Sequence, residues 1–236
     1  MMCVLAVFLD LFPDAPLVVA ANRDEFRGRP SAPPAEVEPG IVAGKDLLGG
    51  GTWLGVNQDG LFVAVTNRFR PPRAANGLSR GTIAIGALRC RTLDEVERLV
   101  HAHTAERPVG GMNLVAVAGR EGISLHWDGA LRGVRLGRGA HVVSTDWDID
   151  DPRLPERAAF EKRLGAATAR PATADLVSFL GSHEGERPVC KHGPAFGTVS
   201  STIYIAGSEG PLLLHAEGPP CSTPFRPVPL PWRSPA

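Results

Sequence analysis

The chain has 236 residues, of which 43% are hydrophobic, so it can bury a sizeable core, and we interpret it as one domain over residues 1–218 with a proline-rich, extended tail over 219–236. Its 25 basic and 25 acidic side chains cancel, which argues against nucleic acid or an anionic membrane as the main partner. No apolar run approaches the ~20 residues of a membrane span, and four cysteines without a CxxC pair indicate a reducing, cytoplasmic compartment with no disulfide framework and no zinc site.

Short apolar runs separated by turn residues predict hairpins in the first third of the chain. Residues 3–11 and 17–21 flank a turn that contains Pro13 and Pro16, and we expect them to pair as a buried hairpin. A proline-rich stretch over 29–39 interrupts the pattern. Three further strands are then expected at 41–43, 51–56 and 61–67. Asn67 therefore stands where a strand ends.

The remainder of the chain alternates between helical and extended patterns. Apolar spacing over 81–103 predicts helices, and four short runs separated by Gly-containing turns predict an antiparallel meander over 112–145. Pro155 is expected to open a helix through 164, and Thr173 is expected to cap a second one through 180. A last hairpin is expected at 199–206 and 211–216. This order favours an α+β fold of antiparallel sheets covered by helices, and a four-layer αββα sandwich satisfies it.

The candidate nucleophile is Cys3, because a cysteine at an amino terminus carries a thiol and a free α-amine in one residue. Free α-amines titrate near ~8 and thiols near ~8.5, so the amine can accept the proton of the thiol before attack on a carbonyl. As numbered, Met1 and Met2 precede Cys3. Three possibilities follow: translation starts at Met2 and that residue is removed, the chain cuts itself, or Cys3 is a buried and inert hydrophobic residue.

Polar residues at two strand ends are candidate partners of Cys3. Asn22-Arg23-Asp24-Glu25 closes the strand expected to pair with that of Cys3, where a carboxylate could hold the ammonium group. Asn67 could donate its amide to a developing oxyanion. The alternative for both is an ordinary polar turn with surface ion pairs of little energetic value.

A series of ordered motifs over most of the chain resembles the NRDE family, also called Transport and Golgi organisation proteins. The motifs are Met2-Cys3, Ala20-Ala21-Asn22-Arg23-Asp24-Glu25, Gly50-Gly51-Thr52-Trp53-Leu54-Gly55-Val56, Thr66-Asn67-Arg68, Ser79-Arg80-Gly81 and Ser200-Ser201-Thr202. The resemblance implies an αββα fold like that of N-terminal-nucleophile hydrolases, related to cysteine acylases such as bile-salt hydrolase and penicillin V acylase, which cleave amide bonds. For the NRDE family itself it implies haem trafficking, the handling of acyl lipids or acyl-CoA, and secretory-pathway organisation.

The resemblance also implies roles for particular residues. Cys3 would be the nucleophile, Asp24 would bind its α-amine, and Asn67 would help to form the oxyanion hole. Where the acylases have a further asparagine this chain has Thr145 and its neighbours, and where they have an arginine near the final hairpin it has Val199. The residues expected to bind a substrate or ligand are Asn22, Arg23, Arg68, Arg80 and Thr145.

The sequence therefore supports two functional hypotheses. The first is an N-terminal-nucleophile amidohydrolase or acyltransferase that acts on a small amide. The second is a non-catalytic carrier of haem or an acyl lipid, in which Arg23, Arg68 and Arg80 pair with propionates or phosphates and His126 is a possible iron ligand. Neither requires a resident cofactor or metal, and the segment Cys190-Lys191-His192, which lacks zinc-ligand spacing, is expected to be a loop.

Overall fold

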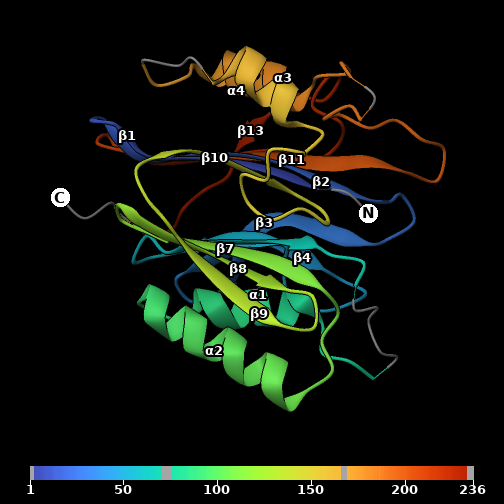
Figure 1. Cartoon of the computed structure of the whole chain (residues 1–236). Helices are drawn as coiled ribbons and strands as arrows, with labels where there is room; N and C mark the ends of the chain where they lie inside the picture. The colour runs from blue at the N-terminus through green and yellow to red at the C-terminus, as the bar shows by residue number, and fades with distance from the viewer. Residues whose placement is uncertain (1–2, 71–75, 166–168, 186, 233–236) are drawn as a thin grey trace. The chain divides into compact units, whose positions relative to one another are not determined.

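The computed structural model describes residues 3–70, 76–165, 169–185 and 187–232. These residues fall into two compact units (Figure 1). The first contains the described residues up to Arg29 together with Arg138–Pro229, and the second contains Pro30–Gly137 with Leu230–Trp232. Met1 and Met2, on which the start-site question depends, lie outside the described residues.

The first unit is built on one antiparallel sheet with the strand order β10-β1-β2-β11-β12-β13. Its strands are β1 (Val4–Phe12), β2 (Ala15–Phe26), β10 (Gly139–Ser144), β11 (Phe196–Gly207), β12 (Gly210–Ala216) and β13 (Arg226–Pro227). The predicted N-terminal hairpin is confirmed, since β1 pairs with β2 in antiparallel register. The predicted last hairpin is confirmed as β11 and β12. The segment expected to be an extended tail contributes β13, which pairs with β12.

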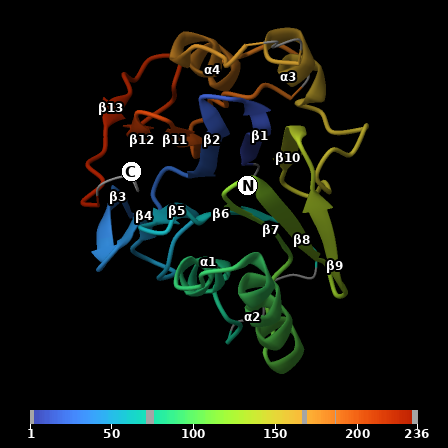
Figure 2. The ribbon, with the colours of Figure 1, turned by 90° about the vertical axis from the view of Figure 1, so that its left-hand side faces the viewer.

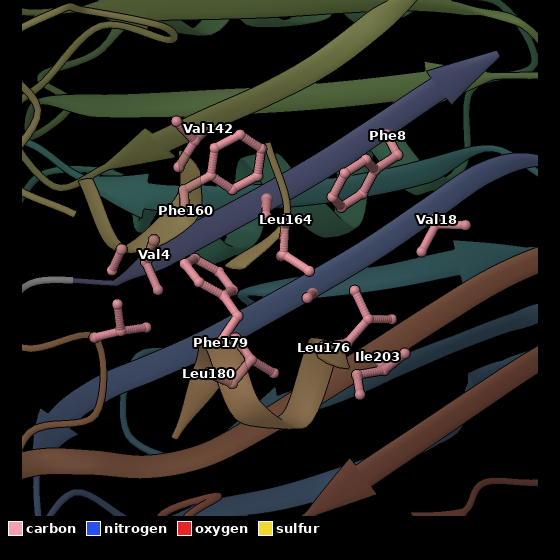
Figure 3. Packing of buried hydrophobic residues seen from close by; sticks show 14 of the residues in the cluster. Val4, Phe8, Val18, Val142, Phe160, Leu164, Leu176, Phe179, Leu180 and Ile203 are labelled. Atoms are coloured by element: carbon pink, nitrogen blue, oxygen red, sulfur yellow. The ribbon is translucent and has the colours of Figure 1, made fainter. Parts of the chain in front are cut away.

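Two helices, α3 (Arg157–Arg163) and α4 (Thr173–Leu180), pack their apolar side chains against this sheet. Phe160 lies between Phe8 of β1 and Phe179 of α4, with ring centroids 5.8 Å from each (Figure 3). The expected cap of α4 is corrected by one position. Ala172, whose backbone is extended, is the N-cap, and the carboxylate of Asp175 in the first turn accepts its backbone N–H at 2.9 Å.

The second unit has its own antiparallel sheet, with the strands in sequence order from β3 to β9 (Figure 2). They are β3 (Ser31–Glu38), β4 (Ile41–Asp46), β5 (Leu54–Asn57), β6 (Phe62–Asn67), β7 (Met112–Ala118), β8 (Glu121–Trp127) and β9 (Leu131–Leu136). Helices α1 (Arg80–Leu88) and α2 (Leu93–Glu106) occupy the region where helices were expected, and their apolar residues share a core with this sheet.

Two expectations are corrected by the pairing of the strands. The proline-rich stretch forms the edge strand β3, whose register shifts between Ala32 and Ala35, around two prolines that cannot donate to the ladder. The meander ends at β9. The run expected to be its fourth strand is β10, which pairs with β1 in the sheet of the first unit.

The α+β class with antiparallel sheets and helices is confirmed by both units. The four-layer order of the sandwich stays a prediction from the sequence. Within the described residues, no helix combines the length and the apolar character needed to cross a membrane.

Candidate functional site

Cys3 directly precedes β1 and is fixed through its backbone by Thr145. The Cys3 nitrogen donates to the Thr145 hydroxyl at 2.9 Å, and the Thr145 nitrogen donates to the Cys3 carbonyl at 3.2 Å. The Cys3 sulfur lies 3.9 Å from the backbone carbonyl oxygen of Asp24. Three residues that are distant in sequence and were expected at the site therefore meet in the first unit.

Strand pairing explains why these residues meet. Val4, the first residue of β1, is paired on one side with Ser144, the last residue of β10, and on the other with Asn22 of β2, so the start of β1 and the end of β10 lie beside Asn22. Directly after Thr145 the chain turns at Asp146, whose φ of 69° is in the left-handed region that aspartate tolerates better than most residues. This turn ends β10 and leaves Thr145 beside Cys3.

Asp24 is almost completely buried, and its side chain is held by two partners. One carboxylate oxygen is 2.8 Å from the Lys191 ammonium, and the other accepts the Thr198 hydroxyl at 2.7 Å. The same hydroxyl accepts the backbone N–H of Lys191 at 2.9 Å. The Thr198 oxygen thus donates once and accepts once, and both carboxylate oxygens of Asp24 have a hydrogen-bond partner.

A second buried carboxylate faces the same ammonium. Glu156 has one oxygen 3.8 Å from Lys191 Nζ, while its other oxygen accepts the Ser144 hydroxyl at 3.0 Å. Asp24 and Glu156 are each 1% exposed, so two carboxylates share one ammonium in a low-dielectric environment. Burial raises the pKa of Asp24, an effect that Lys191 opposes.

The thiol of Cys3 is a weak acid in this environment. Burial, followed by the negative charge of Asp24, raises its pKa to about 11, and the positive charge of Arg23 opposes the increase. At neutral pH the group is therefore a thiol and not a thiolate. A reaction that uses this sulfur as the nucleophile needs a base close to it.

Asn22 is held by three hydrogen bonds, whereas Arg23 affects the site through its charge. The Asn22 amide nitrogen donates to the carbonyls of Leu180 and Val189 at 2.9 and 3.0 Å, and its oxygen accepts the Ser201 hydroxyl at 2.6 Å. These contacts connect β2 to the end of α4, to the following loop and to β11. Arg23 is buried, and its positive charge lowers the pKa of the Cys3 thiol.

The remaining predicted residues belong to the second unit. Asn67 ends β6 opposite Met112 of β7. Arg68 donates to Asn113 at 2.9 Å and pairs with Asp128 at 3.3 Å, while Arg80 donates to the Gly111 carbonyl at 3.0 Å. The oxyanion role of Asn67 and the ligand roles of the two arginines stay predictions from the sequence.

The structure adds residues that the sequence pattern did not indicate. Lys191 reaches Asp24 although 167 positions separate them, and a single lysine in a short loop carries no sequence signal for that contact. Its two neighbours, Cys190 and His192, converge with His183 and Cys221 into a group of sulfur and nitrogen atoms that could hold a metal ion. The spacing of these four residues matches no common zinc motif, because they come from three separate segments.

His126, the proposed iron ligand, is 1% exposed and contacts Asn113 through Nδ1.

A family model and the curated relatives that match this chain carry the same family name. A family model described as Transport and Golgi organisation 2 matches residues 2–152. A Transport and Golgi organization protein 2 homolog of Bos taurus is 26% identical over 82% of this chain and 83% of its own length. The homolog of Homo sapiens is 33% identical over 42% of this chain and 38% of its own length.

Two solved structures resemble the chain at low sequence identity. One is a Caenorhabditis elegans N-acylethanolamine-hydrolyzing acid amidase ortholog, with a TM-score of 0.49, 12% identity and coverage of 87% of this chain and 93% of that one. The other is a single-residue variant of conjugated bile acid hydrolase from Clostridium perfringens, with a TM-score of 0.49, 7% identity and coverage of 96% of both chains.

Proposed function

The chain belongs to the Transport and Golgi organisation 2 family, and on this premise we propose that it is a cysteine N-terminal nucleophile that hydrolyses or transfers the acyl group of a small amide. The observation that carries the proposal is the pairing of a neutral thiol with a fixed nitrogen in Cys3. The thiol has a pKa of about 11, and the nitrogen is held by Thr145 at 2.9 Å.

Removal of the residues before Cys3 would turn that nitrogen into an α-amine with an ordinary pKa near ~8. Such an amine is partly unprotonated at neutral pH and belongs to the same residue as the thiol, so it can act as the base that the thiol requires. The Thr145 hydroxyl would keep the amine in place. The charge of Asp24 would stabilise the ammonium that forms, while Arg23 would stabilise the thiolate.

The reaction follows from these positions. The amine accepts the thiol proton, the sulfur attacks the carbonyl carbon of the amide, and a carbon–sulfur bond forms. The carbon–nitrogen bond then breaks, and the ammonium returns its proton to the leaving amine. Water, or a second acceptor in a transferase, cleaves the thioester and restores the thiol.

The carrier alternative lacks a comparable supporting observation. It requires Arg23, Arg68 and Arg80 to bind an anionic cargo, yet Arg68 and Arg80 contact Asp128 and the Gly111 carbonyl. His126 is buried, which leaves little room for an iron porphyrin at that side chain. The carrier proposal predicts a Soret shift on addition of hemin that is lost in His126→Ala.

The amidohydrolase proposal is tested on natively expressed chain and on a fusion cleaved to begin at Cys3. We expect the intact mass of the native chain to begin at Cys3, and we expect the chain with a free Cys3 to hydrolyse fluorogenic acyl amides. An electrophilic acyl analogue should add its mass to Cys3.

Cys3→Ala should reduce the rate to that of the uncatalysed reaction, and Cys90→Ala, which changes a half-buried cysteine of the second unit, should not change it. A native chain that retains residues before Cys3, together with no hydrolysis and no acylation when Cys3 is freed, would refute the proposal.

A further inference from the structure

Four potential metal ligands, none of which takes part in the proposed reaction, converge in the first unit. His183 follows α4, Cys190 and His192 belong to the loop before β11, and Cys221 lies in the turn after β12. Each offers one ligand atom, and all four atoms lie within 4.8 Å of one another. Cys190 is buried and the other three are exposed, so an ion could reach the site from solvent.

The distances between the ligand atoms resemble the edges of a zinc tetrahedron. The two cysteine sulfurs are 3.7 Å apart, and His192 Nε2 is 3.5 Å from Cys190 Sγ, 3.2 Å from Cys221 Sγ and 3.1 Å from His183 Nε2. Ordinary zinc bond lengths give edges of about 3.8 Å between two sulfurs, about 3.6 Å between sulfur and nitrogen and about 3.4 Å between two nitrogens. Each of these four distances is within about 0.4 Å of the matching edge, and the two remaining ones, from His183 to the cysteine sulfurs, are at most 4.8 Å.

Neither a disulfide nor a pair of hydrogen-bonded histidines accounts for the whole cluster. A disulfide would bring the sulfurs of Cys190 and Cys221 to about 2.0 Å, and both cysteines are free. A hydrogen bond between two histidine rings would account for two of the four converging atoms. The neighbouring carboxylate, Glu184, is paired with Lys162 and Arg163, so the donor set is two sulfurs and two nitrogens. That set is typical of zinc and unsuited to calcium or magnesium, which prefer oxygen ligands.

The backbone holds the ligand segments in place. The Cys190 nitrogen donates to the Ser182 carbonyl at 2.9 Å, which keeps Cys190 next to the segment that carries His183. His192 forms an isolated bridge with Gly197. The nitrogens of Ser222 and Thr223 both donate to the Pro219 carbonyl, at 3.1 and 2.9 Å, and so shape the turn that presents Cys221.

We propose that His183, Cys190, His192 and Cys221 bind one Zn²⁺ ion in a tetrahedral site. Four protein ligands leave no open position for a substrate or water, so the ion has a structural role. It cross-links the end of α4, the loop before β11 and the turn after β12. The loop residue between two of the ligands is Lys191, which contacts Asp24 beside Cys3, so the ion also fixes the segment that supplies this ammonium.

The proposal is tested first by metal analysis of the full chain, purified under reducing conditions without chelators. We expect inductively coupled plasma mass spectrometry to find one equivalent of zinc per chain. After removal of zinc and addition of Co²⁺, the visible spectrum should show the intense d–d bands of tetrahedral cobalt and a thiolate-to-cobalt charge-transfer band. These readouts do not depend on any enzymatic activity and are therefore separate from the test of Cys3.

Variants then identify the ligands. Cys221→Ser and His183→Ala, which change exposed side chains, should lower the zinc content at least tenfold and remove or shift the cobalt bands. Cys90→Ser and His101→Ala, in the second unit, should retain full zinc content. If a ligand variant does not fold, the cobalt spectrum of the unmodified chain still shows whether a tetrahedral site with thiolate ligands exists.

Three results would overturn the proposal. They are a folded, reduced chain that takes up neither zinc nor cobalt, a Cys190–Cys221 disulfide in peptides from natively expressed protein, and full zinc content in both ligand variants.

Discussion

A polar side chain at this site can bind a ligand, stabilise the fold, or do both, and Asn22 is an example. The sequence predicts a ligand-binding role for Asn22, whereas the structure uses its whole side chain in three buried hydrogen bonds. Removing a partner from a buried polar group costs about 1–3 kcal/mol for each group left unpaired. Asn22 is therefore expected to be needed for folding whether or not it also contacts a ligand.

Asn22→Ala should lower the free energy of unfolding by about 3 kcal/mol or more, because it leaves two carbonyls and one hydroxyl without their partner. The control is Ser201→Ala, which removes one of the three bonds and should cost about 1 kcal/mol. Urea unfolding followed by circular dichroism measures both. Unchanged stability in Asn22→Ala together with a weaker substrate affinity would favour the ligand-binding role.

At the scale of elements, the pairing of β2, β11 and β12 places a histidine where it cannot easily be charged. His215 of β12 is 5% exposed and lies opposite Thr202, whose hydroxyl is 2.9 Å from His215 Nδ1. Burial, followed by the positive charge of Arg23, lowers the pKa of His215 from 6.5 to about 4. The neutral ring is therefore part of the folded hairpin.

The low pKa of His215 makes the free energy of unfolding fall as the pH is lowered. Between pH 6.5 and 4 the unfolded chain binds a proton at His215 that the folded chain does not, so acid favours unfolding. By about pH 4 this residue should have lowered the free energy of unfolding by about 3 kcal/mol. Urea unfolding at several pH values should show this loss, and His215→Gln, which can still bond to Thr202, should show less acid sensitivity. Equal sensitivity in both chains would contradict the prediction.

At the scale of the whole molecule, each unit has its own hydrophobic core. Phe179 is fully buried in the core of the first unit, and Leu114 is fully buried in that of the second. Truncating such side chains leaves cavities that cost about 2–5 kcal/mol. We expect each substitution to weaken chiefly the hydrogen-bonded strands of the unit that contains it, since local stability follows local packing.

Native-state hydrogen exchange tests this expectation. Leu114→Ala should speed exchange in β6, β7 and β8 more than in β1 and β2, and Phe179→Ala should do the reverse. Uniform acceleration across both sheets in either variant would mean that the two cores unfold as one cooperative unit.

The local fold could be predicted well because its signals are local. Apolar runs between turn residues located the first and last hairpins, and helical spacing located the helices, since each depends on neighbours in the chain. Predictions failed where pairing partners decide the outcome. The run at 141–145 has the composition of a meander strand, yet residues 141–144 belong to β10, which pairs with β1. A proline-rich stretch became an edge strand because an edge tolerates unpaired positions.

The sequence by itself determined the family, the antiparallel α+β class and the candidate nucleophile Cys3, because ordered motifs and local periodicity carry that information. Only the tertiary structure placed Thr145 on the Cys3 nitrogen, Lys191 on Asp24, and two cysteines beside two histidines. These contacts join segments that lie far apart in the chain, and spacing within a single segment cannot encode them. The chemistry of each group is a property of its residue type, whereas its partners and its pKa are properties of the fold.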